Sequence, residues 1–222
     1  MPVRAIVFDF DGVLADSEGL HLRLYQELLE PAGVVLTEAD YRKDYLGLDD
    51  EGVFRKLAAD FNLLVADEEV EMLIVEKGRR FEQAVKGAAV LYPQAEACVR
   101  RLGARWPLGI ASGALRRDIE LILRPSGLLD AFAFIVAAED VDENKPAPDA
   151  YLLAAGLHGV PAGSCVAIED SLPGLQSAHA AGLKTIAVTH TFPREAVSHA
   201  DAVVDALDEI TTDLVDRLEA GG

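Results

Sequence analysis

Five short apolar runs recur along the chain, and none shows the strict alternation of apolar and polar residues that marks a half-exposed strand. The runs are RAIVFDF (4–10), PLGIAS (107–112), AFIVAA (133–138), CVAIED (165–170) and KTIAVT (184–189). Continuous apolar runs of this length are typical of strands covered on both faces, as in a parallel sheet. We therefore expect five buried strands.

Helical patterns alternate with the last four of these runs. The predicted helices are Gln94–Ala104, Leu115–Leu123, Pro148–Leu157 and Leu172–Ala181. Alternation of strands and helices predicts βαβ units. The expected fold is therefore α/β, with an open, Rossmann-like parallel sheet and helices on both of its faces.

One stretch breaks the alternation, because residues 17–85 carry no good strand signal. It predicts four helices instead: Ser17–Glu30, Thr37–Tyr45, Asp50–Asn62 and Asp67–Val85. In the last one, apolar residues from Val70 to Val85 form a stripe at helical spacing. We expect an inserted helical domain at 16–89 and a core domain at 1–15 and 90–222. The linkers would lie near 15–17 and 87–93, with hinges at Ser17 and Gly87.

The charge of the chain narrows the classes of partner. It has 222 residues, with 38 acidic against 20 basic ones and a formal net charge of −18. This balance argues against nucleic acid and against an anionic membrane surface as partners, because both need a basic footprint. A small anionic substrate remains compatible with it through a local cluster of cations or a metal.

Other features indicate a cytoplasmic protein. No apolar run approaches the roughly 18 residues that span a membrane. The N-terminus lacks the pattern of a signal peptide, since acids interrupt its apolar stretch. Cys98 and Cys165 lack metal-ligand spacing and are expected to be buried thiols in a reducing compartment. With no obvious coiled coil, we expect a monomer.

Candidate chemistry lies where the predicted strands end, which is where open α/β sheets bind ligands. These positions hold Asp9 and Asp11 with Gly12, Ser112 with Gly113, Lys145 in NKPAPD, and Glu169 with Asp170. Each has an ordinary explanation when taken singly. Ser112 and Glu169–Ser171 could cap helices, and Lys145 could be a solvated loop residue. Because all of these residues are expected at one edge of the sheet, a shared ligand-binding or catalytic site is favoured.

The residue types indicate the chemistry of that site. Several carboxylates in one place require a cation, and hard oxygen ligands without histidine or cysteine favour Mg²⁺. A metal and a lysine together suit a phosphoryl group. One carboxylate could attack it and form an aspartyl-phosphate. A carboxylate two residues later could protonate the leaving alcohol and then activate water.

The segments DFDGVLADS, ASG, KPAPD and IEDSLPG resemble the four motifs of the haloacid dehalogenase superfamily. The resemblance covers essentially the whole chain, and the helical insertion is similar to the four-helix cap of that family. By pattern, the sequence is most similar to the sugar-phosphate phosphatases and to β-phosphoglucomutase. The resemblance implies a Mg²⁺-dependent enzyme that acts on a small phosphorylated metabolite.

The resemblance also implies roles for the acidic residues. Asp9 would be the nucleophile. Asp11 would be the general acid and base, and its backbone carbonyl would bind Mg²⁺. Asp170 would ligate the metal, and Glu169 would do so directly or through water. Because halide-displacing relatives lack the second aspartate and transport ATPases carry threonine there, Asp11 implies phosphate-ester hydrolysis or phosphomutation.

The remaining motif residues would bind the phosphoryl group. The resemblance gives Ser112 and Gly113 contacts to its oxygens. Lys145 would neutralise its charge and orient Asp9.

The predicted cap bears on the choice between phosphatase and mutase. His21 falls where the mutase has a histidine at the start of its cap. The loop YLGLDDEG resembles the mutase loop whose arginine holds a distal phosphate, and Asp50 stands at that position here. An aspartate would repel a second phosphate. This departure favours a phosphatase for monophosphates, with a phosphomutase as the alternative.

Three further cations are candidate substrate contacts. Lys77 lies on the apolar stripe of its helix, where a lysine can also cover apolar surface with its stem and keep its charge in water. Arg116 and Arg80 are candidates of the same kind, with a solvated position as the ordinary explanation. For His21 the corresponding explanation is a packed or capping histidine.

Two non-enzymatic alternatives fit the sequence less well. A phospho-accepting receiver module would have about half this length, no helical insertion and no carboxylate two residues after the phospho-acceptor. A catalytically silent binding protein would have no need of a complete set of reactive residues.

Overall fold

The computed structural model describes residues 2–46, 48–86 and 90–220 of the chain. The chain divides into two compact units, Met1–Asp16 with Val90–Gly222 and Ser17–Ala89. We call the first the core unit and the second the helical unit. In the described residues, no helix has both the length and the apolar character that crossing a bilayer requires.

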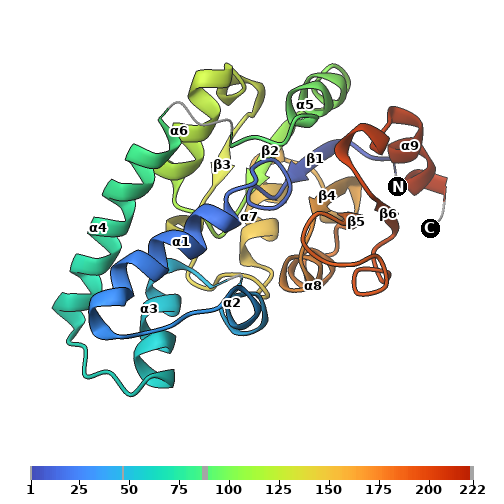
Figure 1. The fold of residues 1–222 in the computed structure, drawn as a ribbon. Coiled ribbons are helices and arrows are strands. Elements are labelled where there is room, and N and C mark those ends of the chain that lie inside the picture. Colours follow the sequence, from blue (N-terminus) through green and yellow to red (C-terminus); the bar gives the residue numbers. More distant parts are fainter. Residues whose placement is uncertain (1, 47, 87–89, 221–222) are drawn as a thin grey trace. The chain divides into compact units, whose positions relative to one another are not determined.

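The core unit is built on a parallel six-stranded sheet with the strand order β3-β2-β1-β4-β5-β6. The strands are β1 (Ala5–Phe8), β2 (Leu108–Ala111), β3 (Ile135–Val136), β4 (Cys165–Glu169), β5 (Lys184–Val188) and β6 (Ala202–Val204). Figure 1 shows β1 in the middle of the sheet, between β2 and β4. Ile6 lies opposite Leu108 on one side and Val166 on the other. This register brings the carboxyl ends of the central strands to one edge.

Helices cover both faces of this sheet, as predicted. They are α5 (Ala95–Gly103), α6 (Arg116–Ser126), α7 (Asp149–His158), α8 (Leu172–Ala180) and α9 (Thr212–Ala220). Ala5 and Val7 pack with residues of α7 and α8, including Tyr151. Phe8 points to the other face, since neighbours in a strand alternate, and its ring meets Phe132 edge-on at 6.0 Å. The apolar composition of the strands therefore follows from burial on both sides.

The helical unit has its own apolar core. Its helices are α1 (Glu18–Leu29), α2 (Glu38–Asp44), α3 (Asp50–Asp60) and α4 (Asp67–Val85). Tyr25, Phe54, Leu57 and Val70 belong to one buried cluster. The four predicted helices are thus present at nearly the predicted bounds.

Side-chain caps explain where two of these helices begin. Thr37 accepts a hydrogen bond from the Asp40 N–H before α2, and Asp49 accepts one from the Gly52 N–H before α3. Ser17, predicted as a hinge, is buried at the start of α1, where its carbonyl accepts the N–H of His21. Gly87, the other predicted hinge, lies outside the described residues.

The structure departs from the predicted elements in two places. The strand expected at 133–138 is reduced to two residues, because the chain turns at Ala137, whose N–H bonds to Asp140 at 2.8 Å. Strand β6 and helix α9 were not predicted. Strand β6 has three residues and pairs only with β5, and so short a run carries no clear pattern. Cys98 and Cys165 are buried free thiols, as expected.

Candidate active site

The end of β1 places Asp9 and Asp11 at the edge of the sheet. The Asp9 N–H bonds to the Ile168 carbonyl at 2.9 Å, so pairing with β4 continues one residue past the strand. The chain then turns sharply at Gly12, whose φ of +75° favours glycine. The Gly12 N–H bonds to the Ala15 carbonyl at 2.8 Å. The side chain of Asp9 is buried, whereas Asp11 is partly exposed.

Lys145 binds two carboxylates from different strands. Its Nζ lies 2.7 Å from Oδ1 of Asp9 and 2.6 Å from Oε1 of Glu169. Its side chain is only 10% exposed, which excludes the solvated-loop explanation. Burial alone would lower the pKa of Lys145, but the two carboxylates outweigh it and raise that pKa. Burial raises the pKa of Asp9 to about 7, against the opposing effect of Lys145.

Glu169 is fully buried and holds several donors together. Its Oε1 accepts from Lys145 and from the Tyr151 hydroxyl at 2.7 Å. Its Oε2 accepts from the N–H groups of Asp170 and Ser171 and from the Ser171 hydroxyl. A carboxylate offers about four acceptor positions, so these donors take up most of them. These contacts hold the Glu169 carboxylate in a fixed orientation at the end of β4.

Two glycines leave room for these carboxylates. A Cβ on Gly174, in the first turn of α8, would lie 2.0 Å from the Glu169 carboxyl. A Cβ on Gly12 would lie 1.9 Å from Oδ2 of Asp170. The same Asp170 oxygen accepts a hydrogen bond from the Thr191 hydroxyl. The close approach of backbone to carboxylate thus depends on the absence of a side chain at both positions.

Three of the predicted acidic residues form a group that suits a cation. Asp9, Glu169 and Asp170 each offer one oxygen, and these atoms lie within 4.8 Å of one another. All three side chains are buried. Oxygen donors without histidine or cysteine suit Mg²⁺. The side chain of Asp11 is not part of this group, and the family resemblance assigns only its backbone carbonyl to the metal.

Ser112 follows β2 at the same edge of the sheet. Its N–H bonds to the Val136 carbonyl at 2.9 Å, and its hydroxyl accepts the Ala114 N–H at 3.1 Å. Because α6 begins at Arg116, Ser112 is not the N-cap of that helix. Its hydroxyl proton is available to another acceptor. At Gly113 a Cβ would meet open space.

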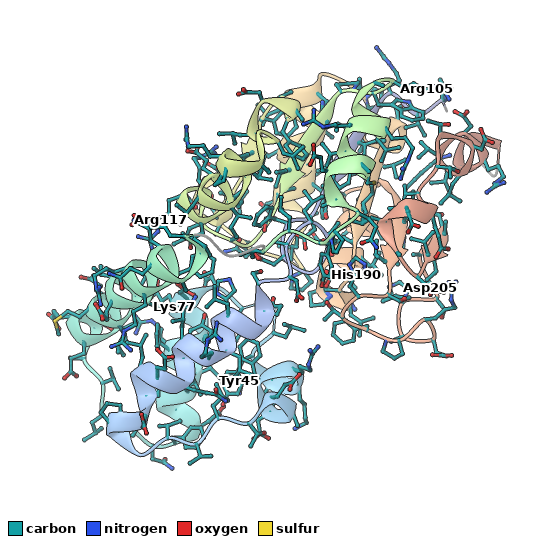
Figure 2. The ribbon with its side chains drawn as sticks, turned by 45° about the horizontal axis from the view of Figure 1, so that its top comes forward. Tyr45, Lys77, Arg105, Arg117, His190 and Asp205 are labelled. Carbon is teal, nitrogen blue, oxygen red and sulfur yellow. The ribbon has the colours of Figure 1, made fainter. Side chains whose placement is uncertain are left out.

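In the helical unit, Lys77 is buried rather than extended into water. Only 2% of it is exposed, and its ammonium forms an ion pair with Asp50. Nζ also lies 2.8 Å from Nδ1 of His21 and 4.5 Å from the centre of the Tyr25 ring. Figure 2 labels Lys77 on α4 among the helices of this unit. The explanation that the lysine keeps its charge in water is therefore wrong.

The partners of Lys77 set the charge state of this cluster. Burial, together with the neighbouring ammonium of Lys77, lowers the pKa of His21 to about 3, so the imidazole is neutral. Burial would raise the pKa of Asp50, but Lys77 and the Tyr25 hydroxyl, 2.6 Å from it, bring that pKa below 3.8. The charge of Lys77 is thus balanced by Asp50.

The two candidate arginines bind groups of their own units. Arg116 donates to the Ile135 carbonyl at 2.8 Å and to Asp140 at 2.5 Å. Arg80 pairs with Glu76 at 2.8 Å. These contacts support structural roles for both guanidinium groups.

Comparison with known proteins identifies the family of this chain. Residues 3–182 match the family model of the haloacid dehalogenase-like hydrolases. The chain belongs to this family. It is 29% identical to protein CbbY of Rhodobacter capsulatus over 228 residues, which cover 98% of this chain and all of that protein. It is 30% identical to the fructose-1-phosphate phosphatase YqaB of Escherichia coli (strain K12), covering 82% of this chain and 95% of that protein.

Solved structures share the fold of this chain. A β-phosphoglucomutase from Clostridium difficile superposes with a TM-score of 0.89 at 21% identity, covering 98% of this chain and 97% of the other, which shows the shared fold. A mutant CbbY from Rhodobacter sphaeroides in complex with xylulose-(1,5)bisphosphate has a TM-score of 0.87 at 27% identity, covering 96% and 99% of the two chains.

Membership in the haloacid dehalogenase-like hydrolases confirms the resemblance that the motifs carry. With the phosphatases among the relatives, it also confirms the prediction of a phosphoric monoester hydrolase and leaves a phosphomutase consistent.

Sequence reasoning missed two side chains that contact the acidic group. Tyr151 lies inside an apolar helix, where a single tyrosine gives no pattern. Thr191 follows β5, so the rule that directs attention to strand ends would have found it.

Proposed function

We propose that the chain is a Mg²⁺-dependent phosphatase that hydrolyses a small phosphorylated metabolite, a sugar phosphate, through an aspartyl-phosphate on Asp9. The proposal is carried by one observation. Lys145 bridges Asp9 and Glu169 at the carboxyl edge of the sheet, beside Asp170. A buried carboxylate held by a cation next to other acidic groups suits attack on a phosphoryl group.

In the first step, one carboxylate oxygen of Asp9 attacks the phosphorus of the substrate. The new oxygen–phosphorus bond forms as the ester bond to the leaving alkoxide breaks. Lys145, at 2.7 Å from Oδ1 of Asp9, fixes one carboxylate oxygen and so orients the other. The proton that the leaving oxygen needs comes from the carboxyl group of Asp11.

In the second step, Asp11 acts in the reverse direction. As a carboxylate it accepts a proton from a water molecule, whose oxygen attacks the phosphorus of the aspartyl-phosphate. Inorganic phosphate leaves and the carboxylate of Asp9 is restored. Asp11 suits both steps because it lies two residues from the nucleophile and is partly exposed.

The phosphoryl oxygens carry negative charge through both steps. Lys145 supplies a fixed positive charge, and Ser112 supplies a hydroxyl proton from the end of the neighbouring strand. The backbone of Gly113 can approach the substrate closely because it carries no side chain. These groups hold the phosphoryl group in line with Asp9.

Asp9, Asp170 and the backbone carbonyl of Asp11 would hold Mg²⁺, and Glu169 would reach it directly or through water. The bound ion would neutralise phosphoryl charge and lower the pKa of Asp9, which burial raises to about 7 without it. Asp9 would then attack as the carboxylate at neutral pH.

The helical unit provides evidence on how many phosphate groups the substrate carries. We propose that residues 17–89 act as the cap expected from the family, which excludes water during turnover. Its buried Lys77 is balanced by Asp50, so this cluster adds no free positive charge for a second phosphate. This favours a monophosphate, as in the relative named fructose-1-phosphate phosphatase, over a bisphosphate.

A phosphomutase is the second candidate, because His21 falls where the mutase has a histidine at the start of its cap and the fold matches that of a β-phosphoglucomutase. A mutase would use the same aspartyl-phosphate but return the phosphoryl group to the substrate.

³¹P NMR separates the two candidates. The purified protein is incubated with Mg²⁺, a panel of sugar monophosphates and a trace of sugar bisphosphate, with EDTA in a parallel sample. We expect inorganic phosphate to accumulate, to be abolished by EDTA, and to be absent with Asp9→Asn. Asp130→Asn is the matched control, because Asp130 is exposed in the short 3-10 helix Leu129–Ala131 of the core unit. Isomerised sugar phosphate without free phosphate would instead identify a mutase.

A further inference from the structure

The loop after β5 contacts two parts of the candidate active site. The Thr191 hydroxyl donates to Oδ2 of Asp170. Nδ1 of His190 donates to the Gly12 carbonyl at 2.9 Å. A Cβ on Gly12 would lie 2.9 Å from the Thr191 hydroxyl oxygen and 1.9 Å from Oδ2 of Asp170, so these three residues are close neighbours. One loop therefore touches both the turn after β1 and the end of β4.

This loop has anchors that do not involve the Thr191 hydroxyl. The Thr189 N–H bonds to the Val204 carbonyl at 3.0 Å, which continues the pairing of β5 with β6. The His190 ring stacks on Tyr92, with ring centres 4.0 Å apart and planes 27° apart. Figure 2 labels His190 in the core unit. The backbone at Thr191 is thus held in place independently of its side chain.

The hydroxyl acts on a carboxylate that has acidic neighbours. Asp170 offers one oxygen to the group that it forms with Asp9 and Glu169, within 4.8 Å. Repulsion inside such a group favours turning a carboxylate away. A donor on Oδ2 fixes the orientation of the Asp170 carboxylate, which offers one oxygen to this group. Because threonine is neutral, it does so without cancelling the negative charge that binds the cation.

We propose that Thr191 is a positioning residue, which orients Asp170 for binding the divalent cation of the proposed phosphatase. The inference rests on that proposed function. A hydrogen-bond donor of this kind orients the side chain that binds the metal, and its loss typically weakens metal affinity by about 10–100-fold.

The test measures metal binding without turnover. Free Mn²⁺ is titrated by electron paramagnetic resonance in the presence of the parent protein and of four variants. Thr191→Val and Thr191→Ala remove the hydroxyl, and Thr191→Ser retains it. Thr189→Val is the matched control, because it removes a threonine hydroxyl bound to Asp205 at 3.0 Å in the same loop. The thermal unfolding midpoint without metal is recorded for each protein.

We expect Thr191→Val and Thr191→Ala to weaken Mn²⁺ binding by about 10–100-fold while the midpoint stays near that of the parent. Thr191→Ser and Thr189→Val should bind Mn²⁺ like the parent. Parental affinity in the variants without hydroxyl would overturn the inference. The inference would also be overturned if neither Thr191→Val nor Thr191→Ala folded, because the hydroxyl would then be needed for folding. A parent that binds no Mn²⁺ and releases no phosphate would refute the proposed function itself.

Discussion

Replacing Lys77 by methionine should destabilise the helical unit, because it removes the partner of a largely buried carboxylate. Methionine retains most of the apolar stem of the lysine. It loses the ion pair with Asp50, the hydrogen bond to His21 at 2.8 Å and the contact with the Tyr25 ring. Asp50 would keep only the Tyr25 hydroxyl among the partners described above, and its side chain is 16% exposed.

The size of the effect follows from the charge left behind. Removing one partner of a buried ion pair costs about 3–5 kcal/mol. Protonation of Asp50 limits this cost. Converting a carboxyl with the ordinary pKa of 3.8 to its acid form at pH 7 costs about 4 kcal/mol. Without Lys77, burial raises the pKa of Asp50, so protonating Asp50 at pH 7 costs less than this. We therefore expect a loss of about 3 kcal/mol in the free energy of unfolding.

Urea unfolding followed by two signals measures this loss. Far-UV circular dichroism reports both units, whereas the fluorescence of the single tryptophan, Trp106, reports the core unit. Lys56→Met is the matched control. Lys56 also pairs with an aspartate, at 2.8 Å, and lies 5.1 Å from a tyrosine ring, but its side chain is 38% exposed. Lys56→Met should leave the dichroism transition close to that of the parent, because exposed ion pairs contribute little to stability.

A double variant tests the cause. Lys77→Met with Asp50→Asn removes both charges and should unfold within about 1 kcal/mol of the parent, since an uncharged replacement of a buried pair is often neutral. The reasoning is refuted if Lys77→Met unfolds like the parent, or if the double variant is as unstable as the single one.

Three further predictions concern other groups. Because the pKa of His21 falls from 6.5 to about 3 on folding, the unfolded chain binds its proton first as pH decreases. His21 should therefore lower the free energy of unfolding by up to about 1.4 kcal/mol per pH unit between about pH 6.5 and 3. His21→Asn should flatten this slope in urea titrations; an unchanged slope would contradict the burial of the neutral ring. Tyr151→Phe should cost about 1–3 kcal/mol, because it removes a buried donor to Glu169; Trp106 fluorescence would report it, and an unchanged midpoint would count against the contact. Asp170→Asn should raise the Mg²⁺ concentration for half-maximal phosphate release by more than about 10-fold; an unaltered metal dependence would place the cation elsewhere.

The sequence predicts most of this fold because its signals are local. Apolar runs mark β1, β2, β4 and β5, and helical periodicity marks the helices of both units. The motif residues could be placed together because parallel strands end at one edge. Lys145 shows the value of that rule, since its position in a loop says little until the topology brings it to Asp9, 136 residues away.

What the sequence did not predict depends on contacts between distant side chains. The pairing of Lys77 with Asp50 joins two helices, and no spacing in the sequence indicates it. The same holds for Tyr151 on Glu169 and for Thr191 on Asp170. Strand β6 was missed because three residues that pair with a single neighbour give too short a pattern.

Trapping of the covalent intermediate tests the central claim most directly. The protein is mixed with Mg²⁺ and a sugar monophosphate that it hydrolyses, quenched during turnover and treated with borohydride, which reduces an aspartyl-phosphate to homoserine. Peptide mass spectrometry then locates the reduced residue. The account predicts homoserine at Asp9, dependent on substrate and absent from Asp9→Asn. Phosphate release with Asp9 unmodified, or with homoserine at another position, would contradict it.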